Sequence, residues 1–255
     1  MKLISCHDGK LVRVEQTMLG SGGGFVTGLS DLDALLPPGG LARGAVHDVL
    51  WDDRRGHPRP GAFAAVLARA AARSPAPADD LRPVVWADPL GELYPPALVA
   101  LGIPLDRLFL LRAADADAAE WALAECLACP GVGATVAPVG RLTRVAARRL
   151  QLAAERGGGA GILLRPASAA LGPGAEHAAT TRWLVTPAPG RRTVQRWKIE
   201  LIHGHGGRPH EPVYLELTRG HDDDGHIGLA CRRVETDRVR APDAVGHRPA
   251  PPAAG

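Results

Sequence analysis

Short apolar runs alternate with helix-length segments through the middle of this chain, and this alternation restricts the possible folds more than any other feature. The runs have the length of buried strands, and Gly and Pro residues separate them from the segments that follow. The expected strands are residues 45–50, 83–88, 108–111, 132–139 and 161–164, and the expected helices are residues 26–36, 60–73, 95–101, 115–129 and 142–156. Strands that alternate with helices build a parallel sheet covered by helices. The sequence therefore predicts an α/β fold with a mostly parallel central sheet and helices on both faces.

The pattern changes after residue 180. Residues 181–186, 193–202 and 213–218 alternate apolar and polar side chains, and Gly- and Pro-containing turns separate them. A period of two is typical of a strand with one buried face, and short turns between such strands favour hairpins. We therefore expect antiparallel strands at the C-terminal end of the core.

These patterns divide the chain into three parts. Residues 1–25 are a weak N-terminal segment that ends in a glycine-rich stretch, and residues 26–218 are the expected core. The core begins with a short helix, for which Ser30 or Asp31 is the predicted N-cap. Residues 219–255 are polar and end in a Pro- and Ala-rich stretch, so we expect a mostly disordered tail.

Length, charge and cysteine content limit the class of protein. The 255 residues suit one α/β domain with a tail, and the net charge of +3 permits nucleic-acid contact without arguing strongly for it. No stretch approaches the roughly 20 apolar residues that cross a bilayer, and the N-terminus lacks the apolar run of a signal peptide. With four cysteines, the expectation is a cytoplasmic protein with reduced thiols and no membrane contact.

Two groups of metal-ligating residue types occur, and we interpret neither as a metal site. Cys126 and Cys129 have redox or zinc spacing but lie in an apolar helix pattern without a second cysteine pair. His203, His205 and His210 lie in a glycine-rich turn and lack a clear fourth ligand. The sequence therefore predicts no metal.

The run from Trp51 to Pro58 has the position and the spacing of a phosphate-binding loop but not its residues. Such a loop reads G-x-x-x-x-G-K-[ST] between a strand and a helix. Gly56 keeps the second glycine, whereas Trp51, His57 and Pro58 occupy the positions of the first glycine, the lysine and the hydroxyl residue. Pro58 has no N–H to donate to a phosphate.

The other side chains of this run are charged. Asp52 and Asp53 would repel a triphosphate, and Arg54 and Arg55 offset part of that charge without matching the geometry of the lysine. We interpret the run as a surface loop between a strand and a helix. The sequence therefore predicts no nucleotide cofactor, and it assigns no catalytic residue.

Four stretches, taken in order, resemble the RecA recombinase core and, more closely, the ImuA family. They are residues 28–33 with 39–44, residues 86–96 with 101–108, residues 148–155 with 161–166, and residues 181–183 with 196–201. Each motif is weak alone, but their order and spacing together make the resemblance specific. It covers about residues 25–218.

The resemblance implies an accessory factor of the SOS-induced mutasome, which performs translesion DNA synthesis and causes mutagenesis. The implied partners are ImuB, a Y-family polymerase homologue, and indirectly an error-prone polymerase α subunit, with RecA and weakly bound DNA as further candidates. The implied location is the cytoplasm, in association with the nucleoid. Two alternatives remain open: a nucleotide-dependent RecA-like ATPase that binds single-stranded DNA, and a regulator of RecA filaments.

The resemblance also gives places where a working ATPase would need particular side chains. The acid that orients the attacking water would fall on Leu90, with Glu92 two residues further on and Asp88 more suited to capping a turn. The acid that holds Mg²⁺ would end the fourth strand, where residues 137–140 have no carboxylate, and a nucleotide-sensing Gln would fall near residues 165–166. We therefore predict a RecA-like scaffold without ATP hydrolysis.

Positive side chains form the candidate surface for DNA or a protein partner. Three lie at helical spacing on one side of the helix at 142–156 and three lie in the following hairpin: Arg141, Arg144, Arg148, Arg192, Arg196 and Lys198. A solvated Arg-rich face is the plainer interpretation, and an acidic partner or DNA is the functional one. The loops that touch single strands in RecA-like proteins are reduced here, because almost no loop follows Gly140 and residues 167–180 contain no Lys or Arg.

Overall fold

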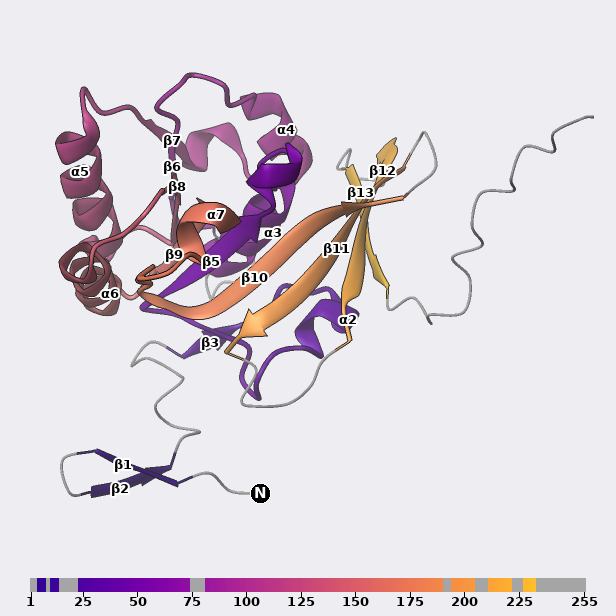
Figure 1. Ribbon diagram of the computed structural model, residues 1–255. Helices are drawn as coiled ribbons and strands as arrows, with labels where there is room; N and C mark the ends of the chain where they lie inside the picture. Colours follow the sequence, from indigo (N-terminus) through magenta and orange to yellow (C-terminus); the bar gives the residue numbers. More distant parts are fainter. Residues whose placement is uncertain are drawn as a thin grey trace, which may run out of the picture.

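A sheet of nine strands forms the centre of the molecule, in the order β13-β12-β11-β10-β5-β9-β8-β6-β7 (Figure 1). The computed structural model describes residues 4–7, 10–13, 23–73, 81–189, 194–204, 211–221 and 227–232. The strands are β5 (Ala45–Trp51), β6 (Val84–Ala87), β7 (Leu108–Leu111), β8 (Ala134–Pro138), β9 (Ala160–Pro166), β10 (Ala179–Ala188), β11 (Val194–His203), β12 (Val213–His221) and β13 (Ile227–Arg232). The part from β10 to β7 is parallel, and the part from β10 to β13 is antiparallel.

Helices cover both faces of the parallel part. Helix α3 (Gly61–Ala72) contacts β9, β8 and β6 on one face, and α5 (Ala116–Ala128) and α6 (Arg144–Gly157) contact β8 and β5 on the other (Figure 1). Covering on both faces explains why β5 and β9 are buried along almost their whole length. The predicted parallel sheet with helices on both faces and antiparallel C-terminal strands is confirmed.

At strand β10 the sheet changes from a part with both faces covered to a part with one covered face. Its residues alternate between buried and partly exposed positions, and fully buried Trp183 packs edge-to-face on Phe63 of α3, with ring centroids 5.7 Å apart. The alternation follows from the period of two in a strand with one covered face. The other face of β10 to β12 carries polar side chains such as Thr186, Lys198 and Glu216.

The smaller elements surround this core. They are β1 (Ile4–His7) and β2 (Lys10–Arg13), which pair with each other, β3 (Gly24–Phe25) and β4 (Leu41–Ala42), which also pair, α2 (Ser30–Asp33), α4 (Pro95–Ala100), α7 (Ala167–Ala170), and the 3-10 turns η1 (Asp53–Arg55) and η2 (Leu105–Arg107). Helix α7 lies directly after β9 and contacts η1, so it covers the end of the sheet where the candidate loop lies.

Two sequence-based expectations are wrong. The helix expected at 26–36 is confined to Ser30–Asp33, and neither Ser30 nor Asp31 caps it, because Leu29 occupies the N-cap position without a side-chain bond. Instead the Asp33 carboxylate accepts bonds from Thr27 N (2.8 Å), Thr27 Oγ1 (2.7 Å) and Gly28 N (3.0 Å). These bonds stabilise a turn before the helix and compete with further helical backbone bonding.

The C-terminal boundary of the core was also placed too early. Strand β12 continues to His221, and β13 pairs with it inside the segment expected to be a disordered tail. Residues 222–226 and 233–255, the rest of that expected tail, lie outside the described residues.

Candidate functional site

The candidate site lies where the parallel strands β5, β9, β8 and β6 end, the edge at which open α/β sheets bind their ligands. Four loops meet at this edge, at residues 52–60, 88–94, 139–143 and 167–178. The polar side chains of these loops determine whether a nucleotide could bind at this edge.

Trp51 belongs to the strand and not to the loop. It is the last residue of β5, and its side chain is only 8% exposed in the core beneath α3. The loop turns through η1 and reverses at Gly56, whose φ of 68° is in the left-handed region that glycine adopts without strain. Arg54, Arg55 and Pro58 are exposed, and His57 is partly exposed. The run therefore forms a surface loop between β5 and α3.

The carboxylate of Asp53 crosses this edge of the sheet. Its Oδ1 accepts a bond from Ser168 N at 3.0 Å and its Oδ2 accepts one from Ser168 Oγ at 2.5 Å, so the loop after β5 is bonded to α7 after β9. These bonds hold the pKa of Asp53 below its ordinary value. The carboxylate of the loop after β5 therefore occupies the backbone and hydroxyl donors of Ser168 at the start of α7.

The start of α3 adds few donors. Pro58 and Pro60 have no N–H, and Gly61, the first residue of the helix, donates its N–H to Arg59 O at 2.8 Å. Arg59 also forms an ion pair with Glu92, with 3.7 Å between Nη1 and Oε2. Glu92, the residue considered as a substitute catalytic acid, is therefore paired with a neighbouring loop.

Asp88 caps the turn after β6, as the sequence predicts. Its carboxylate is almost fully buried and accepts bonds from Glu92 N at 2.9 Å and Leu93 N at 3.3 Å, while Arg112 Nη2 lies 3.3 Å from the other oxygen. Leu90, where the resemblance places the water-orienting acid, is 64% exposed.

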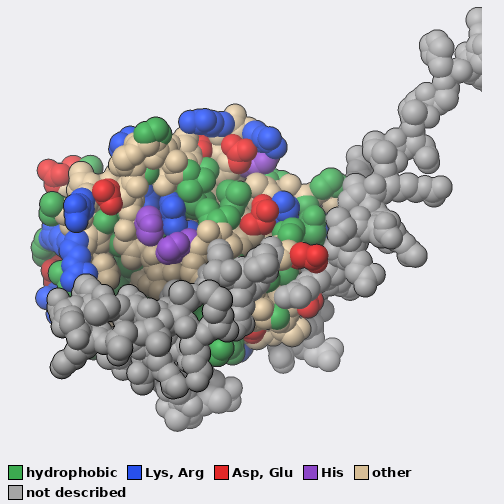
Figure 2. Space-filling model, turned by 60° about the horizontal axis from the view of Figure 1, so that its bottom comes forward, with side chains coloured by type: hydrophobic (Ala, Val, Ile, Leu, Met, Phe, Trp, Pro, Cys, Tyr) green, Lys and Arg blue, Asp and Glu red, His purple; other side chains and the backbone are tan. Residues whose placement is uncertain are grey.

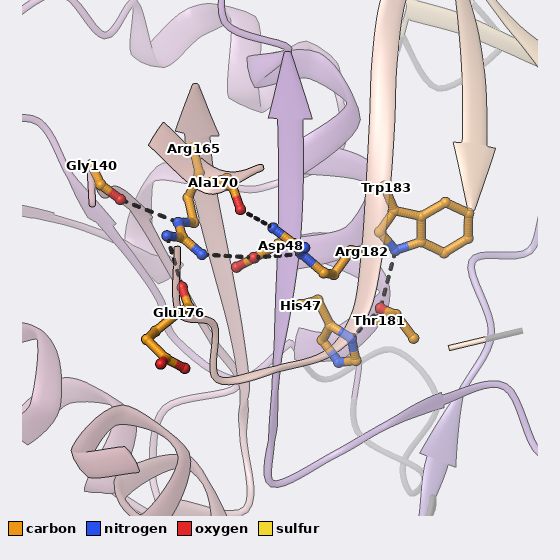
Figure 3. Close-up of polar contacts among 9 residues, drawn as sticks. All are labelled: His47, Asp48, Gly140, Arg165, Ala170, Glu176, Thr181, Arg182 and Trp183. Atoms are coloured by element: carbon orange, nitrogen blue, oxygen red, sulfur yellow. Dashed lines mark hydrogen bonds and ion pairs between the residues drawn. The ribbon is translucent and has the colours of Figure 1, made fainter. Parts of the chain in front are cut away.

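A buried ionic cluster beneath this edge was missed by sequence reasoning (Figure 3). Asp48 of β5 and Arg165 of β9 have fully buried side chains, and Arg165 Nη1 lies 2.9 Å from Asp48 Oδ2. Arg182 of β10 approaches the same oxygen with its Nε at 3.2 Å. A signal was present, because Asp48 and Arg165 are charged residues inside apolar runs, and charged side chains are almost never fully buried unless paired.

The cluster also fixes the loops above it. Arg165 donates from Nε to Gly140 O at 3.2 Å and from Nη2 to Glu176 O at 3.1 Å, and Arg182 donates from Nη2 to Ala170 O at 2.8 Å (Figure 3). Two loop carbonyls and the last carbonyl of α7 are thereby bonded to guanidinium groups of residues in β9 and β10.

Arg141 joins the same two loops from outside. Its Nη2 donates to Pro173 O at 2.9 Å and to Gly174 O at 3.3 Å, and Leu142 forms a β-bridge with Glu176. The loops at 140–142 and 170–176 are therefore bonded to each other, and the Arg141 guanidinium is engaged within the chain.

A second buried polar chain connects β5 to β10 (Figure 3). Trp183 Nε1 donates to Thr181 Oγ1 at 3.2 Å, Thr181 Oγ1 lies 2.7 Å from His47 Nδ1, and His47 Nε2 lies 2.9 Å from Ala42 O. Because a carbonyl only accepts, His47 carries its proton on Nε2 and accepts from Thr181 with Nδ1. Burial lowers the pKa of His47 to about 4, so its ring is neutral near pH 7.

The structure separates the six cationic residues predicted to form a surface. Arg144 and Arg148 lie exposed on one side of α6, whereas Arg141 bonds to the neighbouring loop. Arg196 forms an ion pair with Glu216, and Lys198 forms one with Glu200 at 2.9 Å, both on the antiparallel strands away from α6. Arg192 lies outside the described residues.

The described residues contain no group of three or more His, Cys, Asp or Glu side chains placed to hold a metal ion. Cys126 is partly buried and Cys129 is exposed, and both are free thiols. None of the helices in the described part of the chain has the length and apolar character needed to cross a membrane.

The strand order, the helices on both faces and the antiparallel extension define an α/β protein whose mostly parallel sheet continues into a C-terminal meander. No protein-family model matches the chain. Protein ImuA of Caulobacter vibrioides, from strain NA1000 / CB15N and from strain ATCC 19089 / CIP 103742 / CB 15, is 33% identical over 210 residues, which are 76% of this chain and 84% of the relative. The chain belongs to the ImuA family.

Proposed function

We propose that this chain is a non-catalytic RecA-like accessory protein of the damage-induced translesion-synthesis machinery, with a role in mutagenesis. Its membership of the ImuA family supports this role. In this role the protein recruits or bridges an ImuB-type polymerase homologue and, through it, an error-prone polymerase α subunit, in the cytoplasm near the nucleoid.

The bond between Asp53 and Ser168 is the observation that carries the non-catalytic part of the proposal. It places a negative charge of the chain between the loop after β5 and the helix after β9. A triphosphate at this edge would meet that charge, and residues 51–60 contain no lysine, while Arg55 pairs with Asp52 and Arg59 pairs with Glu92. The edge is better suited to holding its own loops together than to binding a nucleotide.

Two measurements on the purified chain test this function. Calorimetric titration with MgATP should give no saturable binding tighter than about 1 mM. Co-purification with the ImuB-type homologue should give a complex that forms without nucleotide and does not change when MgATP is added. Saturable magnesium-dependent ATP binding would reject the non-catalytic assignment, and the absence of any complex would reject the recruiting role.

A further inference from the structure

A groove of about 740 Å³ runs between α5 and α6, on the face of the sheet opposite α3. Helix α6 lines it with four arginines and three apolar residues: Arg144, Val145, Arg148, Arg149, Leu152, Ala153 and Arg156. In Figure 2, blue side chains gather at the left edge of the molecule, on the side where Figure 1 places α5 and α6. The groove is separate from the sheet edge described above.

The apolar part of the groove is unusually exposed. The side chain of Val145 is 79% exposed and that of Leu152 is 47% exposed. Seven residues separate them, which is about two helical turns, so both lie along one side of α6. Single exposed apolar residues are ordinary, but apolar side chains in one hollow rimmed by charges mark an interaction site.

The charge of the groove is positive. Arg149 is near Glu120 of α5, with 3.6 Å between Nη1 and Oε1, whereas within the described part of the chain no carboxylate lies within ion-pair distance of Arg144, Arg148 or Arg156. Glu125 of α5 is the acidic residue of the lining. Several guanidinium groups therefore face solvent beside an apolar surface.

We infer that this groove binds a short acidic segment of a partner protein, in which carboxylates accompany apolar side chains. Guanidinium groups bind carboxylates through paired hydrogen bonds, and the apolar side chains of such a segment would cover Val145 and Leu152. The distance from Val145 to Arg156 along α6 is about 17 Å, which suits a partner helix of about three turns.

A protein segment fits this groove better than nucleic acid does. Val145 and Leu152 offer neither hydrogen bonds nor an aromatic face on which a base could stack, whereas they can pack against the apolar side chains of a peptide. The inference gives the chemistry of the partner and rests on the proposed recruiting function for its biological setting.

Selection from a display library of random peptides of about 14 residues, or about four helical turns, tests the inference without knowledge of the natural partner. Peptides enriched on the full chain should carry net negative charge and apolar residues at helical spacing. Their binding should weaken at least about tenfold in Arg144→Glu/Arg148→Glu and also in Leu152→Glu. Arg73→Glu makes the same kind of charge change at an exposed residue at the end of α3, on the opposite face, and should leave binding unchanged.

Three outcomes would overturn the inference: no groove-dependent enrichment, enriched peptides without net negative charge, or tighter binding of a single-stranded oligonucleotide than of the peptides to the groove. Thermal unfolding of each variant shows that a loss of binding is not a loss of fold. The complex with the ImuB-type homologue is measured separately. If that complex forms while peptide selection fails, the groove is rejected and the recruiting function stands.

Discussion

At the scale of single residues, the buried carboxylate of Asp48 is the counter-charge of two arginines in the interior. One of its oxygens faces the guanidinium groups of both Arg165 and Arg182, and the side chains of Asp48 and Arg165 are fully buried. Asp48→Asn leaves two arginines without a counter-charge, and we expect it to lower the free energy of unfolding by about 3–5 kcal/mol. Urea denaturation measures this loss.

Arg182→Gln provides the comparison for that variant. Asp48 keeps Arg165 as its partner there, and the Arg182 side chain is 11% exposed, so we expect a smaller loss of about 1–3 kcal/mol. If Asp48→Asn unfolds at the same urea concentration as the wild type, the cluster does not stabilise the fold.

The buried side chain of His47 should make the free energy of unfolding depend on pH. Its pKa falls from the ordinary 6.5 to about 4 in the folded state, because burial disfavours the charged ring. Between these values the unfolded chain binds a proton that the folded chain does not, so stability falls as the pH decreases from about 6.5 to about 4, and His47 contributes no pH dependence above that window. The loss is on the order of 3 kcal/mol.

The matched experiment compares the wild type with His47→Gln, because the carboxylates also titrate as the pH falls. The difference in unfolding free energy between the two proteins should change across this window and stay constant near neutral pH. A constant difference throughout would show that His47 is protonated in the folded state at the same pH as in the unfolded chain.

Asp48 and Arg165 are charged residues inside apolar runs, but the sequence alone does not pair them. Their pairing depends on β5 lying between β9 and β10, although these residues are 117 positions apart in the chain. The bond between Asp53 and Ser168 was not predicted for the same reason, because it depends on β5 and β9 being neighbours in the sheet. Asp88 was different, because its donors are only four and five residues away and a local turn could be expected.

At the scale of secondary structure, the crossing of α5 and α6 depends on Gly157. A Cβ atom at this position would lie 2.0 Å from the backbone oxygen of Leu127 in α5. Gly→Ala in an exposed helix should stabilise it by about 1 kcal/mol, but here the methyl group would push the helices apart, and we expect a net loss of about 1–3 kcal/mol. Peptide binding to the α5–α6 groove should weaken together with stability.

Gly158→Ala is the neighbouring control. Gly158 has a φ of 70°, and no atom lies within 4 Å of the position that an added methyl group would take, so its replacement costs about 1 kcal/mol of backbone strain without crowding α5. Chemical denaturation and the peptide titration together separate the two effects. Equal peptide binding in both variants would show that the Gly157 contact does not set the shape of the groove.

Helix and strand boundaries were predictable where local signals agree. For α6, the expected 142–156 becomes Arg144–Gly157, with Thr143 Oγ1 capping Ala146 N at 3.1 Å and left-handed Gly158 ending the helix. Strand β13 was missed because polar residues surround it, although Ile227, Leu229 and Cys231 alternate at the period of a strand, and it is stabilised by pairing with β12. Pairing between strands carries no local signal of comparable strength.

At the scale of the whole molecule, the carboxyl edge of the sheet is closed by contacts within the chain. Asp53 bonds to Ser168, Arg59 pairs with Glu92, and Arg165 holds Gly140 O and Glu176 O. The loops that would respond to a nucleotide in a working ATPase are thus bonded to one another. The positive groove lies along α6, which begins beside this edge with Arg144 and runs away from it.

This separation predicts weak single-stranded DNA binding that does not depend on nucleotide. Arg141 is bonded to the loop carbonyls of Pro173 and Gly174, so Arg141→Ala should not change DNA affinity, whereas Arg144→Ala and Arg148→Ala should lower it.

The binding should depend only weakly on salt, because few cations are available. A plot of the logarithm of the binding constant against the logarithm of the salt concentration should have a slope no steeper than about −2, which corresponds to about three phosphates. Fluorescence anisotropy with a labelled oligo-dT at several salt concentrations, with and without MgATP, measures this slope. A steeper slope in MgATP that is lost in Arg141→Ala would show that the loops open, and the scaffold would then be a nucleotide-dependent DNA-binding protein.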